Sequence, residues 1–278
     1  MRKGIVVTLG ILSLFLLFTS SVYAWDDLIY LGGHYGGQPG LAWGAAGIRY
    51  GSASDEYDAD GESQPLADDQ TEMRIPIWGT YTPVEKLKLF AIVPFVSTDD
   101  GTDSESGIGD IWLGGVYDIL EDRMLSIRGS LDAPTGDDEK GLGNEGGFGI
   151  DVAALSSKPI NDQLGVHGQV GLRWNGEDSD TEWAPGIGFY LKGLAGYRIN
   201  EKTTSSIGLV YFNQGDGEAG GNEIADSGVD WLELTVGGGY HLTEVIVAGV
   251  GLEYKLMGSN TVQDYGIRVG LGYTFMAP

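Results

Sequence analysis

The chain has 278 residues, no cysteine, 47 glycines and a formal net charge of −24 at pH 7. The lack of cysteine excludes disulfide and thiolate chemistry, and so acidic a chain lacks the basic surface that binds nucleic acid. Many glycines without a collagen-like period, combined with 10% aromatic residues, are typical of sheet proteins whose strands curve tightly.

The N-terminus has the pattern of an export signal. Arg2 and Lys3 precede an apolar run from Ile5 to Phe18, and Val22-Tyr23-Ala24 follows as a small-x-small site. This order predicts a secretory signal peptide over residues 1–24, cleaved between Ala24 and Trp25. The run is shorter than the ~20 residues of a spanning helix, which argues against a membrane anchor. Removal of two cations and no acids leaves the mature chain near −26. We predict one domain over 25–278, with 25–40 as a short lead-in.

The mature chain alternates apolar with small or polar residues in twelve segments, a period that predicts β-strands with two different faces. The segments are 41–52, 71–82, 87–98, 108–120, 124–136, 147–157, 164–175, 185–199, 204–214, 230–242, 245–257 and 264–275. Each has about the ~9–11 residues that a tilted membrane strand needs, or slightly more. The sequence therefore predicts an all-β fold, a transmembrane antiparallel up-and-down barrel of about twelve strands.

Connections between these segments alternate in length. The long ones are 53–70, 99–107, 137–146, 176–184 and 215–229, with a shorter last one at 258–263, and they carry many acids against one cation, Lys140. This predicts short periplasmic turns and long acidic extracellular loops. Solvation and divalent-cation binding at lipopolysaccharide are both open explanations for the acids. Glu56, Asp58 and Asp60 resemble half of a calcium loop, but Ala67 stands where an EF-hand has glutamate. We expect no cofactor and no metal, with these three acids as the one looser calcium candidate.

The charged face of each strand is expected to line the lumen, because Arg or Lys facing lipid at mid-depth costs ~2–4 kcal/mol. The expected lumen-lining residues are Arg49, Arg74, Trp78, Lys88, Asp110, Trp112, Arg128, Asp132, Asp151, Arg173, Lys192, Arg198, Glu233, Glu253, Lys255 and Arg268. The acids in this set could pair with the cations and fill the interior, or leave a positively biased path. Inward glycines either make room or relieve backbone crowding where strands bend.

The last segment indicates how the barrel is assembled and closed. Gly270, Tyr273 and Phe275 fit polar-x-Gly-x-x-Tyr-x-Phe, which resembles the C-terminal signal read by the bacterial barrel-assembly machinery, although three residues follow Phe275. We expect the odd-numbered apolar residues from Ile267 to Phe275 to face lipid. The strand should close the cylinder against the first one near Ile48 and Tyr50.

Three short motifs carry a family resemblance. They are Ser106-Gly107-Ile108-Gly109-Asp110-Ile111-Trp112-Leu113-Gly114, Asp132-Ala133-Pro134-Thr135-Gly136-Asp137 and the following Gly141-Leu142-Gly143-Asn144. Together they resemble outer-membrane proteins of the phenol-degradation meta-pathway (MetA-like) transporter family. The resemblance implies a porin-like transporter, with uptake of hydrophobic or aromatic compounds in some members.

Catalytic motifs are scarce. The histidines are His34, His167 and His241, and no serine partner for a hydrolase is obvious from the sequence. We therefore predict no enzyme, but a Gram-negative outer-membrane channel for passive uptake of small solutes, aromatic or hydrophobic compounds among them. The alternatives are an anion-preferring narrow pore with a basic lumen and a non-conducting structural or surface-interaction barrel. The expected partners are outer-membrane lipid and lipopolysaccharide, the barrel-assembly machinery and a small-molecule solute, with no nucleic acid.

Overall fold

The computed structural model describes residues 39–120, 125–137, 140, 142–143, 147–178 and 182–276. Its strands are β1 Leu41–Tyr57, β2 Ser63–Val84, β3 Leu87–Asp99, β4 Ser104–Ile108, β5 Ile111–Asp118, β6 Ser126–Ala133, β7 Gly149–Pro159, β8 Leu164–Asn175, β9 Trp183–Ala184, β10 Gly188–Arg198, β11 Thr203–Gln214, β12 Glu218–Ala219, β13 Asn222–Glu223, β14 Val229–His241, β15 Ile246–Ser259 and β16 Thr261–Met276. In these ranges no helix is long and apolar enough to cross a membrane.

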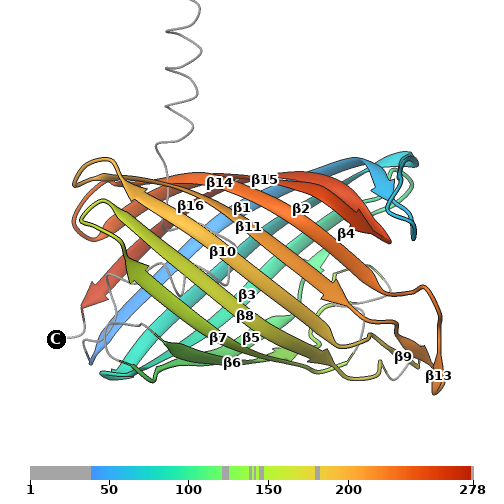
Figure 1. Cartoon of the computed structure of the whole chain (residues 1–278), viewed down its shortest axis with the longest axis horizontal. Helices are drawn as coiled ribbons and strands as arrows, with labels where there is room; N and C mark the ends of the chain where they lie inside the picture. Colours follow the sequence, from blue (N-terminus) through green and yellow to red (C-terminus); the bar gives the residue numbers. More distant parts are fainter. Residues whose placement is uncertain are drawn as a thin grey trace, which may run out of the picture.

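The long strands form one closed antiparallel barrel. Each pairs with its sequence neighbour, and β16 returns to pair with β1 along its length (Figure 1). β4 and β5 both pair with β3 and share one position, so the cylinder has twelve strand positions. The predicted fold class is confirmed, and so is the predicted seam, where Ile48 pairs with Val269 and Tyr50 with Ile267. The two-residue strands β9, β12 and β13 form a small separate sheet.

The largest boundary error concerns the expected loop 53–70. β1 and β2 continue pairing through most of it, and only Asp58–Glu62 remain as a turn. The turn is tight because Asp58 Oδ1 accepts hydrogen bonds from the backbone amides of Asp60 (3.0 Å) and Glu62 (2.9 Å), while Gly61 adopts a φ of 77°. Glycine tolerates this left-handed conformation without a Cβ clash. The loop expected at 258–263 likewise shrinks to Asn260, between β15 and β16.

The fourth strand position is interrupted, which the prediction of an unbroken strand over 108–120 missed. β4 ends at Ile108 and β5 begins at Ile111, so Gly109 and Asp110 belong to neither strand. The break lies beside Pro94 of β3, whose carbonyl accepts a hydrogen bond from the Gly109 amide at 2.8 Å. Proline has no N–H to donate in return, so a regular ladder cannot continue past it.

Candidate functional site

The two faces of the barrel wall differ sharply in side-chain exposure. Large apolar side chains at alternate positions point outward, such as Ile77 (61% exposed) and Leu271 (56%), whereas the side chains between them are largely buried. A closed sheet with an apolar outer face matches a membrane barrel. The candidate functional site is therefore the inner wall.

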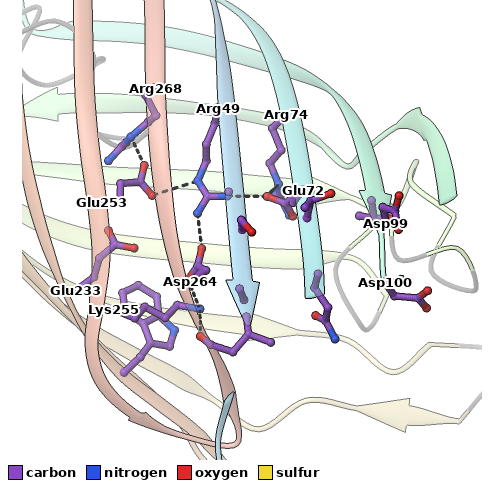
Figure 2. A pocket seen from close by; sticks show the side chains of 18 residues that line it. Arg49, Glu72, Arg74, Asp99, Asp100, Glu233, Glu253, Lys255, Asp264 and Arg268 are labelled. Atoms are coloured by element: carbon purple, nitrogen blue, oxygen red, sulfur yellow. Dashed lines mark hydrogen bonds and ion pairs between the residues drawn. The ribbon is translucent and has the colours of Figure 1, made fainter. Parts of the chain in front are cut away.

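Arg49 is the centre of the largest charged group on this wall (Figure 2). Its guanidinium contacts Glu72 of β2 at 2.9 Å, Glu253 of β15 at 3.1 Å and Asp264 of β16 at 2.6 Å. Arg268 also pairs with Glu253. One arginine thereby ties four strands together around the β1–β16 seam.

Two further cations complete this group. Arg74 of β2 binds Glu72 at 2.9 Å, and Lys255 of β15 binds Asp264 at 3.0 Å. Glu72 and Asp264 were not among the predicted lumen residues. The alternation of the strands contained the signal, because Glu72 lies two residues before Arg74 and Asp264 four residues before Arg268. We call these side chains, with the adjacent Glu233, the Arg49 cluster. Its members are Arg49, Glu72, Arg74, Glu233, Glu253, Lys255, Asp264 and Arg268.

A second polar network lies on β6, β7, β8 and β10. Arg128 is 2% exposed and donates to Asp151 and to the Tyr190 hydroxyl, both at 2.7 Å. The same hydroxyl accepts from Gln169 at 3.0 Å and donates to Asp151 at 2.9 Å. The Tyr190 hydroxyl thus satisfies hydrogen bonds of a buried polar network, while its ring packs among apolar neighbours.

Other predicted lumen residues occupy varied positions. Arg173 pairs with Asp132 at 2.6 Å, and its guanidinium lies 5.2 Å from the centre of the Trp112 ring. Lys192 lies over the Tyr190 ring at 5.4 Å. Lys88 is half-buried in β3, and Arg198 is exposed where β10 ends.

Asp110 does not line an open path but fastens a loop. Its Oδ1 accepts from the backbone amides of Thr135 (3.0 Å) and Gly136 (2.8 Å), and the Thr135 hydroxyl donates to the Gly109 carbonyl at 2.8 Å. These bonds connect two of the sequence motifs directly. Leu142, from the third motif, is 5% exposed and packs over Gly107 and Gly109. The three motifs therefore form one interlocked unit at the interruption between β4 and β5.

An apolar cluster occupies another part of the interior. It consists of Trp43, Trp78, Phe90, Ile92, Val116, Ala153, Leu155 and Tyr190, with Ala45, Trp112 and Phe212 packed against it. Trp78 is only 3% exposed and lies 5.8 Å from Trp43, ring centre to ring centre, at 54°. These side chains are called the Trp78 cluster below.

Several inward glycines leave space for these large side chains. A Cβ at Gly171 would collide with the Tyr190 ring, and one at Gly114 with the Phe90 ring. At Gly51 and Gly266 it would meet the Arg49 guanidinium. The two roles considered for the glycines were to make room and to relieve backbone crowding. These positions favour the first role, and a neighbouring side chain fills the room that each glycine leaves.

The remaining candidate residues are placed as follows. Asp58 serves its own turn, and no group of three or more metal-binding side chains occurs in the part of the chain that is described. Tyr273 and Phe275 are exposed on β16 and pack edge to face at 4.5 Å, and Gly270 pairs with Gly47. Ala24 and Trp25, with the predicted signal peptide and most of the 25–40 lead-in, lie outside the described residues.

One expectation about histidines was wrong. His167 does have a serine partner, because Ser157 Oγ lies 2.7 Å from His167 Nδ1 across the β7–β8 pair. The sequence hid this contact because it depends on strand register. The pair shares the inward face with Gln169 and Leu155, not the lipid-facing surface where an outer-membrane phospholipase would act.

Comparison with known proteins agrees with this architecture. The sequence profile described as "Putative MetA-pathway of phenol degradation" matches residues 3–269. The chain belongs to this family. No curated protein sequence matches it. The profile match alone shows the family, and the protein is a β-barrel of the Gram-negative outer membrane.

Solved structures share the fold. The COG4313 outer membrane channel from Pseudomonas putida F1 has a TM-score of 0.76 at 18% identity, over 87% of this chain and 98% of that one. The translocator domain of autotransporter NalP from Neisseria meningitidis has a TM-score of 0.53 at 14% identity, covering 92% and 100%. The Pseudomonas putida toluene transporter TodX has 0.51 at 11% identity, covering 92% and 95%.

Proposed function

We propose that this protein is a porin-like channel through which small solutes with an apolar part, aromatic compounds among them, cross the outer membrane down their gradients. The observation that carries the proposal is the Trp78 cluster. A barrel needs apolar side chains outside, against lipid, but it has no such need inside. Most of the cluster is buried, but Trp112 and Phe212 at its edge are only half-buried and offer a solute an apolar surface on the inner wall.

The related proteins support the same class of function. The structure with the highest similarity described above is an outer membrane channel, and a toluene transporter shares the fold. Transport, not catalysis, is the role that we propose. The Ser157–His167 hydrogen bond then has a structural role, as a cross-strand contact that satisfies two polar side chains.

The alternative of an anion-preferring pore with a basic lumen has less support. Arg49, Arg128, Arg173 and Arg268 each contact a carboxylate. An arginine ladder attracts anions when its guanidinium groups are not already neutralised. The non-conducting alternative has no specific observation in its favour.

The proposed partners follow from the fold. The apolar outer face contacts outer-membrane lipid, and the acidic extracellular side faces the lipopolysaccharide layer. Tyr273 and Phe275, exposed on the closing strand, are the residues that we propose the barrel-assembly machinery reads.

Liposome swelling tests the proposed function. Purified protein in vesicles is challenged with phenylalanine and with glucose, solutes of similar mass that differ in apolar surface. We expect faster swelling in phenylalanine. Trp112→Ala, at a half-buried inward side chain, should reduce that preference, whereas Trp174→Ala, on an outward side chain that is 48% exposed, should leave it unchanged. Absence of swelling in both solutes, or faster swelling in glucose, would contradict the proposal.

A further inference from the structure

A cavity of about 520 Å³ opens beside the Arg49 cluster, between β1, β2, β14, β15 and β16 (Figure 2). Its charged lining is unbalanced. Among the lining residues that the structure describes, six are acids, namely Glu72, Asp99, Asp100, Glu233, Glu253 and Asp264. Four are cations, namely Arg49, Arg74, Lys255 and Arg268. The cavity therefore carries a formal excess of two negative charges.

Every one of the four cations is already neutralised. Arg49 contacts three carboxylates, Arg74 and Arg268 contact one each, and Lys255 contacts Asp264. An anionic solute entering this cavity would have to displace an internal carboxylate from its partner. It would also meet the repulsion of the excess acids.

Three acids of the lining are not contacted by these cations, and of the three Glu233 is buried whereas Asp99 and Asp100 are exposed. Glu233 is 9% exposed, lines the cavity, and no described residue donates a hydrogen bond to it or forms an ion pair with it. It lies on β14 opposite Lys255 of β15, immediately after an irregularity in the strand register. Figure 2 shows its carboxyl group beside Glu253 and Lys255, on the cavity side of the wall. A buried carboxylate without a partner is unfavourable, and a cationic ligand offsets that penalty.

The cavity already shows how an ammonium group is held. Lys255 Nζ lies 3.0 Å from Asp264 and 5.8 Å from the centre of the Trp231 ring. A carboxylate and an aromatic face are a combination that binds ammonium ions. Trp231 stacks on Phe212 at 5.5 Å and 24°, and Phe212 packs against the Trp78 cluster. The acid-rich cavity is thus continuous with the apolar part of the inner wall.

We propose that this cavity binds a small organic ammonium ion, with the ammonium group at Glu233 and the apolar body toward Trp231 and Phe212. The proposal rests on the proposed channel function and names its solute class as organic amines. Asp99 and Asp100, where β3 ends, line the rim of the same cavity. Negative charge at the entrance raises the local concentration of cations and speeds their arrival.

Calorimetric titration tests the binding independently of transport. The purified protein in non-ionic detergent is titrated with benzylammonium chloride and, in parallel, with sodium benzoate at the same ionic strength. We expect saturable binding of benzylammonium and none of benzoate. Glu233→Gln should weaken the benzylammonium affinity at least tenfold, Glu233→Asp should retain most of it, and Glu201→Gln, at an exposed turn, should leave it unchanged.

The outcomes separate this inference from the proposed function. Binding of benzoate, equal binding of both probes, no binding of benzylammonium, or unchanged affinity in a folded Glu233→Gln protein would overturn the ammonium site. Folding of each variant is checked by its heat-dependent shift in gel mobility. Potassium current through a planar bilayer is recorded with the same preparations. A wild-type protein that binds benzylammonium but carries no current would retain the site and contradict the channel.

Discussion

The Arg49 cluster and the Trp78 cluster share the strands β1 and β2 but have opposite chemistry. On β1, Trp43 and Arg49 are six residues apart and both point inward; on β2, Arg74 and Trp78 are four residues apart and also point inward. Arg49 lies level with Arg74, and Trp43 lies level with Thr80, close to Trp78. On β1 and β2, height along the barrel axis therefore decides whether the inner wall is charged or apolar.

The difference shows how each part is stabilised. In the Arg49 cluster, inward charges are tolerated because neighbouring strands supply the opposite charge at the same height. In the Trp78 cluster, large rings are tolerated because a glycine of the adjacent strand lies beneath them, as Gly114 lies beneath Phe90. Ion pairing stabilises the Arg49 cluster, and the room left by glycines accommodates the rings of the Trp78 cluster. Substitutions should therefore have different consequences in the two clusters.

Loss of Arg49 should produce the largest effect. Arg49→Met leaves Glu72, Glu253 and Asp264 facing one another without their shared cation. Removing one partner of a buried ion pair typically destabilises by about 3–5 kcal/mol. Urea unfolding in lipid vesicles, followed by tryptophan fluorescence, measures the change. Arg198→Met, on an exposed side chain, should change the free energy of unfolding by less than about 0.5 kcal/mol, and equal losses in both variants would refute the pairing account.

Tyr190 belongs both to the Trp78 cluster and to the hydrogen-bond network of Arg128. Removing its hydroxyl therefore tests whether that network stabilises the barrel. Tyr190→Phe keeps the ring but removes the hydroxyl that Arg128 and Gln169 donate to. Leaving buried donors unsatisfied should reduce the free energy of unfolding by about 1–3 kcal/mol. The matched control is Tyr197→Phe, whose exposed hydroxyl binds Gln163 at 3.2 Å. If the two substitutions had the same small effect in the unfolding assay, the network would not stabilise the barrel.

Substitution of Asp110 tests whether its hydrogen bonds hold the three sequence motifs together. Asp110→Ala removes the acceptor for the Thr135 and Gly136 amides. We expect a loss of about 1–2 kcal/mol and faster tryptic cleavage after Lys140, because the loop that carries Leu142 loses its attachment. Asp110→Asn keeps a carbonyl acceptor and should retain most of the protease resistance. Cleavage at the wild-type rate in Asp110→Ala would show that these bonds do not hold the loop.

The smallest predicted effect is a pH dependence at the tip of the β1–β2 hairpin. Backbone donation, chiefly from Glu62, lowers the pKa of Asp58 below its ordinary value. The lowered pKa means that the carboxylate stabilises the turn at neutral pH, and that this contribution disappears as the pH falls through the folded-state pKa. An NMR titration of the Asp60 and Glu62 amide shifts should therefore have its midpoint below the value for an unperturbed aspartate. A midpoint at or above that value would exclude the capping role.

The strand pattern and the closing seam could be predicted from the sequence because alternation and an apolar outer face are local properties. The segment 164–175 coincides with β8, and Arg268 is buried while its neighbours Ile267 and Val269 are exposed. Contacts that depend on register between distant strands could not be predicted. The Ser157–His167 bond, the triple contact of Arg49 and the break opposite Pro94 all belong to this class.

The acids between predicted strands misled the prediction in one respect. Asp55, Glu56, Asp68 and Asp69 suggested a loop, yet they belong to β1 and β2. Such a strand meets no lipid when the hairpin extends past the membrane, so acidic residues are compatible with it. Composition alone does not separate a soluble hairpin from a loop.

Single-channel recording of the purified protein in a planar bilayer shows whether the barrel conducts ions. We expect discrete current steps. Because the inward arginines are neutralised while acids line the cavity near Arg49, we also expect the reversal potential in a potassium chloride gradient to show a preference for potassium over chloride. Glu233→Gln should shift this potential toward chloride. A bilayer that stays sealed with correctly folded protein would contradict the account.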